Sequence, residues 1–561
     1  MTPKPWSLFQ LSKTAWTLSL LDFQSTAATI AENARLDSGR LSAWRAPLAI
    51  NDHNSGAFTV PSNTRTIYKH RDRAGNAYWL VWTTDVHAIS SPIAEDPYDR
   101  LYWTGQQFPR MSIGTEVTGS VNPTYEPSVT RKLGVPQPTD TPTVAVSTAL
   151  PNSTAIALSR AYAYTWVSGL GEESGPSPAS AIIDVKSGEI VTITLTGTVP
   201  AHIYNTGGRP AARRIYRTGA NGDFQFVKDI PYGTASTTDS ILDENLGEII
   251  PTTEWDAPPD ENGGDHPDGP LLGLTAMPNG IVAGFTGRSV FFSEAFIPHA
   301  FPRSYSLTTK SKIVGLASIS IGLLVMTQGK PVLITGSSPA SMAAVEIDNN
   351  QACVSGRSIA DMGEVALYAS PDGIVAGGEN GVSLVTDGIF SRDQWQALNP
   401  SSIHGYHYEG RYIFFWLNGG SSGGYVFDGR GNTPMISTLN YYAKAGFNDP
   451  VDDALYLVVT EGGSTTVRKF DAGSALPYAW QSKEVRLEKP INPSCAIVDA
   501  ESYPVAFTLY ADGVQKHTQS VTSGSLFRLP AGYMAKEFQF KLTGTTDVNQ
   551  VLIAESPEEF Q

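Results

Sequence analysis

A repeat of paired strands constrains this chain more than any other feature of its sequence. Apolar, strand-like runs begin near Val282, Leu323, Ala366, Tyr412 and Leu455, so the steps between them are about 41, 43, 46 and 43 residues. A second strand-like run follows each of them, after glycine-rich turns. Paired strands with a period of about 40 to 50 residues are the sequence signature of a β-propeller, with one blade per repeat. Five such units are visible.

A circular propeller must close on itself, and the N-terminal region offers a closing element. The stretch "YWLVWTTDVHAIS" (Tyr78–Ser90) has the same hairpin texture as the repeats. We expect it to supply a sixth blade, which gives a β-propeller of five to six blades. The region between this stretch and the repeats is then an insertion between blades.

Composition favours strands over helices along the whole chain. There are 52 glycines and 38 prolines among 561 residues, and threonine, valine, tyrosine and tryptophan fill the intervals between them. This punctuation is typical of all-β proteins. The best candidate for a helical period is "FQSTAATIAENARL" (Phe23–Leu36), which predicts one short helix. We therefore predict an all-β fold in which helices are minor.

The stretch "RAYAYTWVSGLGEESGPSPAS" (Arg160–Ser180) predicts a second kind of β domain. Tyr162, Tyr164 and Trp166 fall on one face of a strand and smaller residues on the other, so both faces can be covered. A Gly-Glu-Ser-Pro turn follows, and the combination is similar to the late strands of fibronectin type III domains. We predict an inserted immunoglobulin- or fibronectin III-like sandwich.

The length of the chain requires several domains, because single cores stop growing at roughly 250–300 residues. We expect the following division: 1–105, an N-terminal segment with the short helix and propeller-closing strands; 106–150, an extended connector rich in proline and threonine; 151–265, the inserted sandwich; 266–477, the propeller repeats; and 478–561, a C-terminal β-sandwich.

Charge and cysteine content exclude several classes of protein. The formal charge of −15 argues against a protein that grips nucleic acid, although the same sign suits a chain that lets DNA pass without holding it. Cys353 and Cys495 predict two buried free thiols rather than a disulfide framework. The longest apolar run, Ile313–Met326, is too short for a membrane span, and the N-terminus does not resemble a signal peptide. We expect a soluble product made in a cytoplasm.

The stretch "VFFSEAFIPHAFP" (Val290–Pro302) places Ser293, Glu294 and His299 close together, which suggests a catalytic triad. Consecutive strand residues point to opposite faces, and Pro298 restricts the backbone before His299. A triad needs side chains that converge from separate loops. We therefore expect a structural turn with His299 held by a hydrogen bond. If Phe291 and Phe292 are buried, replacing either with alanine should cost about 3–5 kcal/mol.

Three other motifs resemble catalytic signatures without their context. Ser421 in "GGSSG" lies between two strands rather than between a strand and a helix, which predicts a hairpin loop. "HRDRAGN" (His70–Asn76) predicts a charged hairpin tip, because no phosphate-covering loop precedes it. "SPDGIVAGG" (Ser370–Gly378) lacks the aromatic residue of the Asp-box in sialidase propellers.

Two acidic loops leave a cation site open. Asp260, Glu261, Asp265 and Asp268 form one loop, and Leu242–Asn245 the other; neither matches the EF-hand spacing. A solvated acidic loop is favoured, with adventitious Ca²⁺ or Mg²⁺ as the alternative. His404 and His407 are three apart on a strand and face opposite sides, which makes a poor metal pair. We assign no catalytic, cofactor-binding or metal-binding residue and expect no enzyme and no cofactor.

Several stretches resemble one family of phage structural proteins. "RRIYRTGANGDFQFVKDIP" (Arg213–Pro231), "AMPNGIVAGFTGRSVFFSEAFIPHAFP" (Ala276–Pro302), "GKPVLITGSSPASM" (Gly329–Met342) and "QACVSGRSI" (Gln351–Ile359) look like the tail nozzle, or tail tubular protein B-like, proteins of short-tailed phages. The resemblance is densest from about residue 213 to 400 and extends more loosely to both ends of the chain.

The resemblance implies a structural virion protein: a homohexamer that forms the distal tail tube, attached to the head-to-tail adaptor ring, with tail fibres or spikes nearby. The genome is retained and ejected through its bore, and the protein is synthesised in the host bacterial cytoplasm. The main alternative is a β-propeller lectin, from a phage or secreted, that recognises host-surface glycans. A propeller glycosidase, which needs paired carboxylates, is a weaker alternative.

Overall fold

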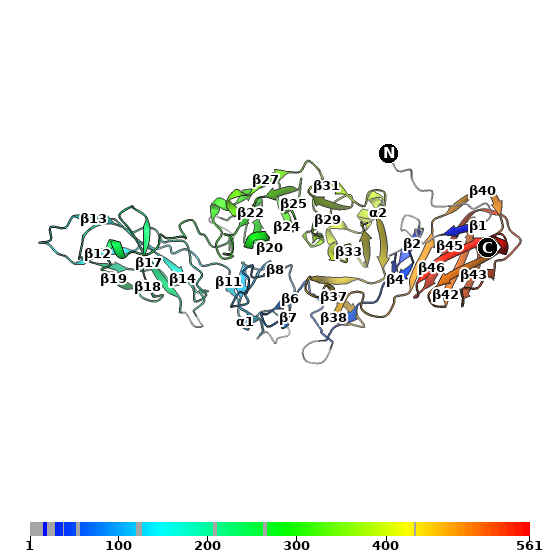
Figure 1. The fold of residues 1–561 in the computed structure, drawn as a ribbon, viewed down its shortest axis with the longest axis horizontal. Coiled ribbons are helices and arrows are strands. Elements are labelled where there is room, and N and C mark those ends of the chain that lie inside the picture. Colours follow the sequence, from blue (N-terminus) through cyan, green and yellow to red (C-terminus); the bar gives the residue numbers. More distant parts are fainter. Residues whose placement is uncertain are drawn as a thin grey trace. The chain divides into compact units, whose positions relative to one another are not determined.

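The computed structural model describes residues 15–18, 28–36, 39–51, 57–118, 126–205, 210–261, 266–430 and 434–560. Strands dominate it, so the all-β prediction is confirmed (Figure 1). The described part has two α-helices, α1 (Gly114–Thr118) and α2 (Arg392–Ala397). Within those residues, no helix combines the length and the hydropathy that a membrane crossing requires.

Contacts divide the chain into two compact units, Tyr68–Asn350 and a second one made of Met1–Ile67 and Gln351–Gln561. Each unit contains three sets of four antiparallel strands in which most sequence neighbours are also sheet neighbours. Five of these sets are complete four-stranded sheets, and the sixth, residues 404–439, is one end of a ten-stranded sheet. We call each such set a meander.

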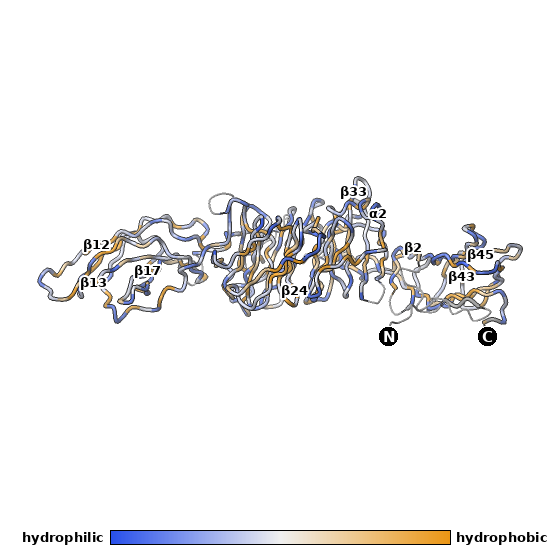
Figure 2. The backbone as a smooth tube through the Cα atoms, turned by 90° about the horizontal axis from the view of Figure 1, so that it is seen from above, coloured by the Kyte–Doolittle hydropathy of each residue, from blue (hydrophilic) through white to orange (hydrophobic). Residues whose placement is uncertain are grey.

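The meanders of unit Tyr68–Asn350 come from three stretches of the chain (Figure 1). Their strands are β8 (His87–Ser90), β9 (Leu101–Thr104), β10 (Arg110–Ser112) and β11 (Arg131–Lys132); β20 (Leu272–Ala276), β21 (Val282–Thr286), β22 (Ser289–Phe292) and β23 (Leu307–Thr308); β24 (Ile313–Ile319), β25 (Gly322–Thr327), β26 (Val332–Thr335) and β27 (Ala343–Glu346). The second and third share one apolar core. The longest apolar run of the sequence forms β24 and most of β25, and β24 lies in a strongly apolar part of the tube in Figure 2.

The other unit has the same design. Its strands are β28 (Ala360–Asp361), β29 (Val365–Ala369), β30 (Ile374–Gly378) and β31 (Gly381–Leu384); β32 (His404–Tyr408), β33 (Arg411–Asn418), β34 (Ser421–Asp428) and β35 (Met435–Leu439); β36 (Ala443–Asp449), β37 (Ala454–Glu461), β38 (Ser464–Lys469) and β5 (Leu48–Ala49). Successive meanders share apolar cores. The third takes its fourth strand, β5, from about four hundred residues earlier in the chain.

The predicted strand pairs are largely present. β21 pairs with β22, β25 with β26, β33 with β34, and β37 with β38, each as an antiparallel hairpin. In the remaining repeat β30 lies between β29 and the expected partner strand. The expected hairpin Tyr78–Ser90 is absent, because β8 pairs with β9 while β7 (Ala77–Trp82) belongs to a separate two-stranded sheet.

The predicted helix within Phe23–Leu36 is wrong for the residues that the structure describes. Residues 28–36 carry β2 (Ala28–Glu32) and β3 (Ala34–Arg35), whereas residues 23–27 lie outside the described part. β2 pairs with β39 (Tyr478–Ser482) and β35, so ladders with distant strands override the local helical period. Asn33 separates the two strands in a left-handed conformation (φ 49°) and donates a hydrogen bond to the carbonyl of Pro477 at 3.0 Å.

The segment 106–150, expected to be an extended connector, contains regular structure. β10, α1 and β11 form part of the first meander, and β12 (Thr143–Thr148) begins the next module. The strand pairs β9–β10 and β10–β11 supply the backbone hydrogen bonds that the proline- and threonine-rich composition did not suggest.

Residues 143–239 carry a further set of strands within unit Tyr68–Asn350, the β12–β19 module (Figure 1). One sheet has the order β12–β16–β19, a second β14–β17–β18, and β13 pairs with β15. The remaining bounds are β13 (Ala157–Arg160), β14 (Tyr162–Val167), β15 (Ile183–Lys186), β16 (Ile190–Thr194), β17 (Ala212–Thr218), β18 (Phe224–Pro231) and β19 (Ser236–Asp239). Every residue of β14 is buried, which confirms that both its faces are covered.

Three serines cover the free edge of β14. Ser174, Ser177 and Ser180 are three residues apart, and each donates its backbone N–H to a carbonyl of β14, at 2.8–2.9 Å. Each Oγ also accepts the N–H of the same strand residue, at 2.9–3.1 Å. This serine ladder satisfies an edge that otherwise invites pairing with another chain.

The C-terminal module, residues 478–560, also has two sheets around one core. β1 (Ala15–Leu18), β46 (Val548–Ala554), β41 (Cys495–Ala500) and β44 (Phe527–Arg528) form the first. β39, β45 (Ala535–Gly544), β42 (Val505–Ala511) and β43 (Val514–Val521) continue the sheet of β32–β35, and β40 (Val485–Ile491) pairs with β45.

Candidate functional site

Ser293 is a structural residue in the turn that follows β22. Its side chain is fully buried; its Oγ accepts the backbone N–H of Val282 at 2.9 Å and donates to the carbonyl of Glu294 at 2.9 Å. Glu294 Oε2 accepts the hydroxyl of Tyr305 at 3.0 Å. The serine hydroxyl therefore has no side-chain base to activate it.

His299 is positioned by packing. Its ring lies edge-on to Trp255, with centroids 5.9 Å apart at 81°. Its Nε2 is buried and finds no hydrogen-bond partner among the residues that the structure describes, so the expected hydrogen bond is absent at this atom. Burial lowers the pKa of His299, which keeps the ring neutral. The three residues of the suspected triad form no catalytic arrangement.

The other catalytic look-alikes are turns. Ser421 begins β34 directly after the hairpin turn that contains Gly419 (φ 60°), and its side chain is exposed. In the stretch His70–Asn76, Asp72 Oδ1 accepts the backbone N–H of Asn76 at 2.8 Å, which closes a charged turn. Both observations confirm the hairpin predictions.

The acidic loops use their carboxylates internally. Asp243 Oδ1 accepts hydrogen bonds from Arg160 at 2.8 Å and Arg217 at 2.7 Å. Asp260 Oδ2 accepts the ammonium of Lys132 at 2.7 Å, while Asp265 lies outside the described residues. Across the described ranges, no three His, Cys, Asp or Glu side chains come together as a metal site.

His404 and His407 face opposite sides of β32, as expected. His404 is fully buried and stacks on Phe415, with centroids 5.6 Å apart. His407 Nε2 accepts the N–H of Gly410 at 3.0 Å. Both cysteines are buried and unpaired, which confirms that prediction, and burial raises the pKa of Cys353 to about 12.

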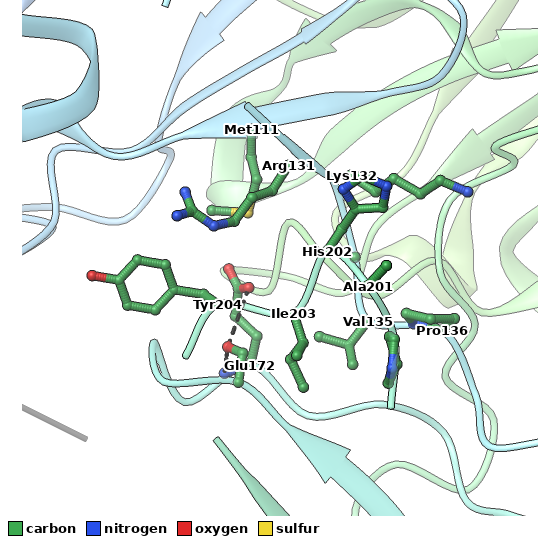
Figure 3. Close-up of a pocket in the computed structure, with 13 residues that line it drawn as sticks. Met111, Arg131, Lys132, Val135, Pro136, Glu172, Ala201, His202, Ile203 and Tyr204 are labelled. Carbon is green, nitrogen blue, oxygen red and sulfur yellow. Dashed lines mark hydrogen bonds between the residues drawn. The ribbon is translucent and has the colours of Figure 1, made fainter. Parts of the chain in front are cut away.

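A cavity of about 340 Å³ lies in unit Tyr68–Asn350, where the first meander meets the β12–β19 module (Figure 3). Arg131 and Lys132 of β11 form one side, and residues 200–204 form another. The apolar part of the lining includes Met111, Val135, Pro136, Ala201 and Ile203.

The cations at this cavity lie against aromatic rings. The Arg131 guanidinium is 4.7 Å from the centre of the Tyr204 ring, and its NH1 bonds Glu116 at 2.6 Å. Lys132 and His202, which also line the cavity, both lie against Phe108: the Lys132 ammonium is 5.3 Å from the centre of this ring, and the His202 ring is 5.9 Å from it. The cavity therefore combines apolar walls with a few oriented charges, as small-molecule sites do.

A buried ion network supports the inner end of the cavity. Arg100 bonds Asp96 at 2.7 Å and Glu172 at 3.0 Å, and all three side chains are at most 7% exposed. Burial opposes the charge of Asp96, but Arg100 outweighs it and holds the pKa of Asp96 below its ordinary value. Glu172 lines the cavity, so its carboxylate is held in place there by Arg100.

Sequence reasoning did not find this cavity. Arg131 and Lys132 fall in the segment expected to be a connector, and His202 and Tyr204 fall in the predicted sandwich. No short motif links them, since about seventy residues separate the two pairs. Their meeting depends on how β11 and the β12–β19 module fold together.

A second cavity, of about 590 Å³, lies in the other unit between the meanders β28–β31 and β32–β35. Its lining is mainly apolar, including Leu367, Ala376, Val385 and Phe427, and Glu364 and Arg430 are its charged residues. Asp428 Oδ2 accepts Arg430 NH2 at 2.6 Å, so this guanidinium is already neutralised.

Comparisons with known proteins assign no family. No family model matches the chain, and no curated protein matches it. Among solved structures, an exo-β-1,3-galactanase from Phanerochaete chrysosporium matches 73% of this chain and 99% of its own, with a TM-score of 0.21 and 8% identity. The extracellular domain of a hybrid two component system from B. thetaiotaomicron matches 98% and 78%, with a TM-score of 0.23 and 9% identity. These TM-scores are too low to carry an inference.

Proposed function

We propose that this chain is a structural virion protein, the tail nozzle of a short-tailed phage. Its core is a six-bladed β-propeller, the β12–β19 module is an immunoglobulin- or fibronectin-like sandwich inserted between two blades, and the C-terminal module is a third β domain. Six copies form a channel attached to the head-to-tail adaptor ring, and the genome is retained and ejected through it.

The observation that carries the propeller is the set of six four-stranded meanders. Each has the strand order expected of a propeller blade. In the last one, β38 pairs with β5 from the N-terminal region, at Lys469 with Leu48 and Arg468 with Ala49. Such a blade, built from both ends of the chain, is how a circular propeller closes without leaving an exposed edge.

The role of the polar side chains supports a structural rather than a catalytic protein. The hydroxyl of Ser293 makes its hydrogen bonds with backbone groups. Asp243 accepts a hydrogen bond from a guanidinium group, and Asp260 accepts one from an ammonium group. Polar groups that are hydrogen-bonded in this way stabilise the fold and are not available to activate a nucleophile or a water molecule.

The acidic balance supports a DNA channel that does not hold its cargo. With a formal charge of −15, the assembled ring repels a polyanion wherever carboxylates face the bore. Low site affinity for phosphate keeps the genome mobile, because tight binding requires lysine and arginine to displace counterions.

Imaging of assembled tails tests the proposal. In particles, we expect sixfold density at the tip of the tail that fits this chain, and particles made without the chain should not retain DNA. Absence of the chain from purified virions contradicts the nozzle. If it is absent and the isolated chain binds host-surface glycans saturably, the lectin alternative is correct.

A further inference from the structure

We propose that the 340 Å³ cavity beside β11 binds a small organic anion. Its carboxylate or phosphate group lies near Lys132 and His202 of the lining and near Arg110, which is not a lining residue but the cross-strand neighbour of Lys132, and its apolar body enters the cavity. This site is independent of the nozzle proposal, because it rests on the geometry of unit Tyr68–Asn350 alone.

The first argument is a pair of like charges in the sheet. Arg110 of β10 and Lys132 of β11 are direct cross-strand partners in an antiparallel ladder. Both cations lie over the same ring, Phe108, at 4.9 Å and 5.3 Å from its centre. Like charges directly opposite each other destabilise a sheet unless an anion lies between or beside them.

The second argument is that the chain supplies too little negative charge at this point. Asp260 bonds Lys132 at 2.7 Å. Arg110 donates from NH1 to the hydroxyl of Thr130, at a long 3.4 Å, and its buried Nε finds no partner in the described part of the chain. A guanidinium in this state has donors left for an incoming anion, and hydrogen bonds between charged partners are the strong ones.

The third argument concerns the orientation of the ligand in the cavity. At the opposite side of the cavity Arg131 is already paired with Glu116, and Glu172 is held by Arg100. The fixed carboxylate of Glu172 repels an anionic group there. A ligand therefore orients with its anionic end toward Lys132 and His202, which lie together on one side of the view in Figure 3.

The fourth argument concerns the body of the ligand. Met111, Val135, Pro136 and Ile203 give the cavity apolar walls, and 340 Å³ lies within the range of about 300–1,000 Å³ seen for small-molecule sites. A phenyl or short alkyl group fits these walls better than a bare inorganic ion does, because apolar surface is then removed from water.

Calorimetric titration of the full chain tests the site. The probes are 3-phenylpropionate, phenyl phosphate, the neutral isostere 3-phenylpropanol and inorganic phosphate. We expect both aromatic anions to bind saturably, and the neutral and inorganic probes to bind at least about tenfold more weakly. The relative affinities of the two aromatic anions distinguish a carboxylate from a phosphate ligand.

Variants locate the site. Arg110→Gln should weaken 3-phenylpropionate binding about tenfold or more, and the exposed His202→Ala should weaken it several-fold without endangering the fold. Lys310→Gln is the matched control, because its side chain is 82% exposed and lies on a different meander. Circular dichroism confirms folding of each variant.

Three results overturn the proposal: no saturable binding of either aromatic anion at millimolar concentration, equal binding of 3-phenylpropanol, or unchanged binding in both Arg110→Gln and His202→Ala. If Arg110→Gln fails to fold, the His202→Ala result alone decides.

Discussion

The β12–β19 module and the C-terminal module are both two-sheet β structures, yet they hold their sheets together differently. The core around the C-terminal module has twenty-one buried apolar residues, nineteen of them within residues 478–560, and Ser482 is the one buried polar residue in the described part of the module. The core around the β12–β19 module has eleven buried apolar residues, ten of them within residues 143–239. Buried arginines and carboxylates replace the missing apolar contacts there.

The arginines of β17 illustrate this difference. Arg213 donates to three backbone carbonyls, those of Tyr232, Leu195 and Gly197, at 2.7–3.2 Å, and it lies over Trp166 at 4.7 Å. Arg217 and Asp239 form an ion pair at 2.7 Å in which both side chains are fully buried. Such pairs are expensive to bury and very expensive to break.

The stability of the smaller core, in the β12–β19 module, depends on specific ion pairs and hydrogen bonds. The stability of the larger core, in the C-terminal module, depends on how well apolar side chains fill its volume. Removing one charge from the β12–β19 module leaves a buried group unpaired. Removing one apolar side chain from the C-terminal module leaves a cavity. The predictions below test this contrast in order of decreasing effect, with local unfolding free energies from hydrogen exchange as the main measurement.

Asp239→Ala should have the largest effect. Asp239 Oδ2 accepts hydrogen bonds from Arg217 at 2.7 Å and from Tyr162 at 2.8 Å, and both donors are buried. The expected loss is about 3–5 kcal/mol in the unfolding free energy of strands β16–β19. Asp229→Ala is the control, since its exposed pair with Arg214 should contribute no more than about 1 kcal/mol. Equal effects of the two substitutions would contradict the contrast.

Leu509→Ala should destabilise the C-terminal module by about 2–5 kcal/mol, because this fully buried side chain lies in the middle of its core. Exchange of the amides in β42 and β45 measures the loss. The neighbouring Thr508→Ala removes only a hydroxyl contact with Thr518 at the surface and should cost about 0.2–1 kcal/mol. Protection in the β12–β19 module should not change in either variant.

Alkaline pH should destabilise the β12–β19 module. Burial, and then the nearby carboxylates Asp239, Asp140 and Glu173, raise the pKa values of Tyr162, Tyr164 and Tyr216. Since the folded pKa is raised, this stabilisation is complete below the unfolded tyrosine pKa of about 10 and is lost as the pH rises beyond it. Absorbance at 295 nm should show that these three tyrosines ionise only when the module unfolds. Ionisation of the three near pH 10 while the module is still folded would contradict this prediction.

Tyr216→Phe should show how much of this loss of stability at alkaline pH comes from Tyr216. Its hydroxyl donates to the buried carboxylate of Glu173 at 2.7 Å, so the variant should lose about 1.5–3 kcal/mol near neutral pH. The drop in stability above about pH 10 should also become smaller, because one ionising group is gone. Tyr510 of the C-terminal module has a half-buried side chain. Tyr510→Phe should change neither the stability near neutral pH nor the loss of stability above about pH 10.

Ser177→Ala should have the smallest effect. The variant removes the Oγ that accepts the N–H of Tyr164 at 3.1 Å but keeps the backbone bond between the same residues. The expected cost is about 0.5–1.5 kcal/mol, together with faster exchange of the Tyr164 amide. Ser159→Ala, an exposed serine of the same module, is the control. An unchanged Tyr164 amide would show that the serine ladder does not protect this edge.

The sequence predicted the features that depend on neighbours in the chain. The stability cost expected for replacing Phe291 or Phe292 was conditional on their burial, and they are 9% and 0% exposed. The alternation around Tyr164 was correct, as were four strand pairs of the repeat. Each depends on a two-residue period or on a glycine turn between adjacent strands, which a local stretch of sequence already contains.

Features that depend on distant partners were missed. Residues 28–36 form strands because β2 pairs with β39, about four hundred and fifty residues away. The cavity was not predicted because β11 and residues 200–204 are far apart in the chain. The roles of Arg213, Arg214 and Arg217 were also invisible, since neighbouring arginines on one strand have entirely different partners.

The sequence by itself determined the class of fold, four of the repeat hairpins and the structural turn at Ser293, because strand period, turn residues and backbone restriction act over a few residues. Only the tertiary structure decided which charges are buried as pairs, which strand completes the last meander, and where Arg110 and Lys132 lie opposite each other with Asp260 paired to Lys132. The energy of a buried charge depends on every group within a few ångströms of it, and folding brings those groups from all parts of the chain.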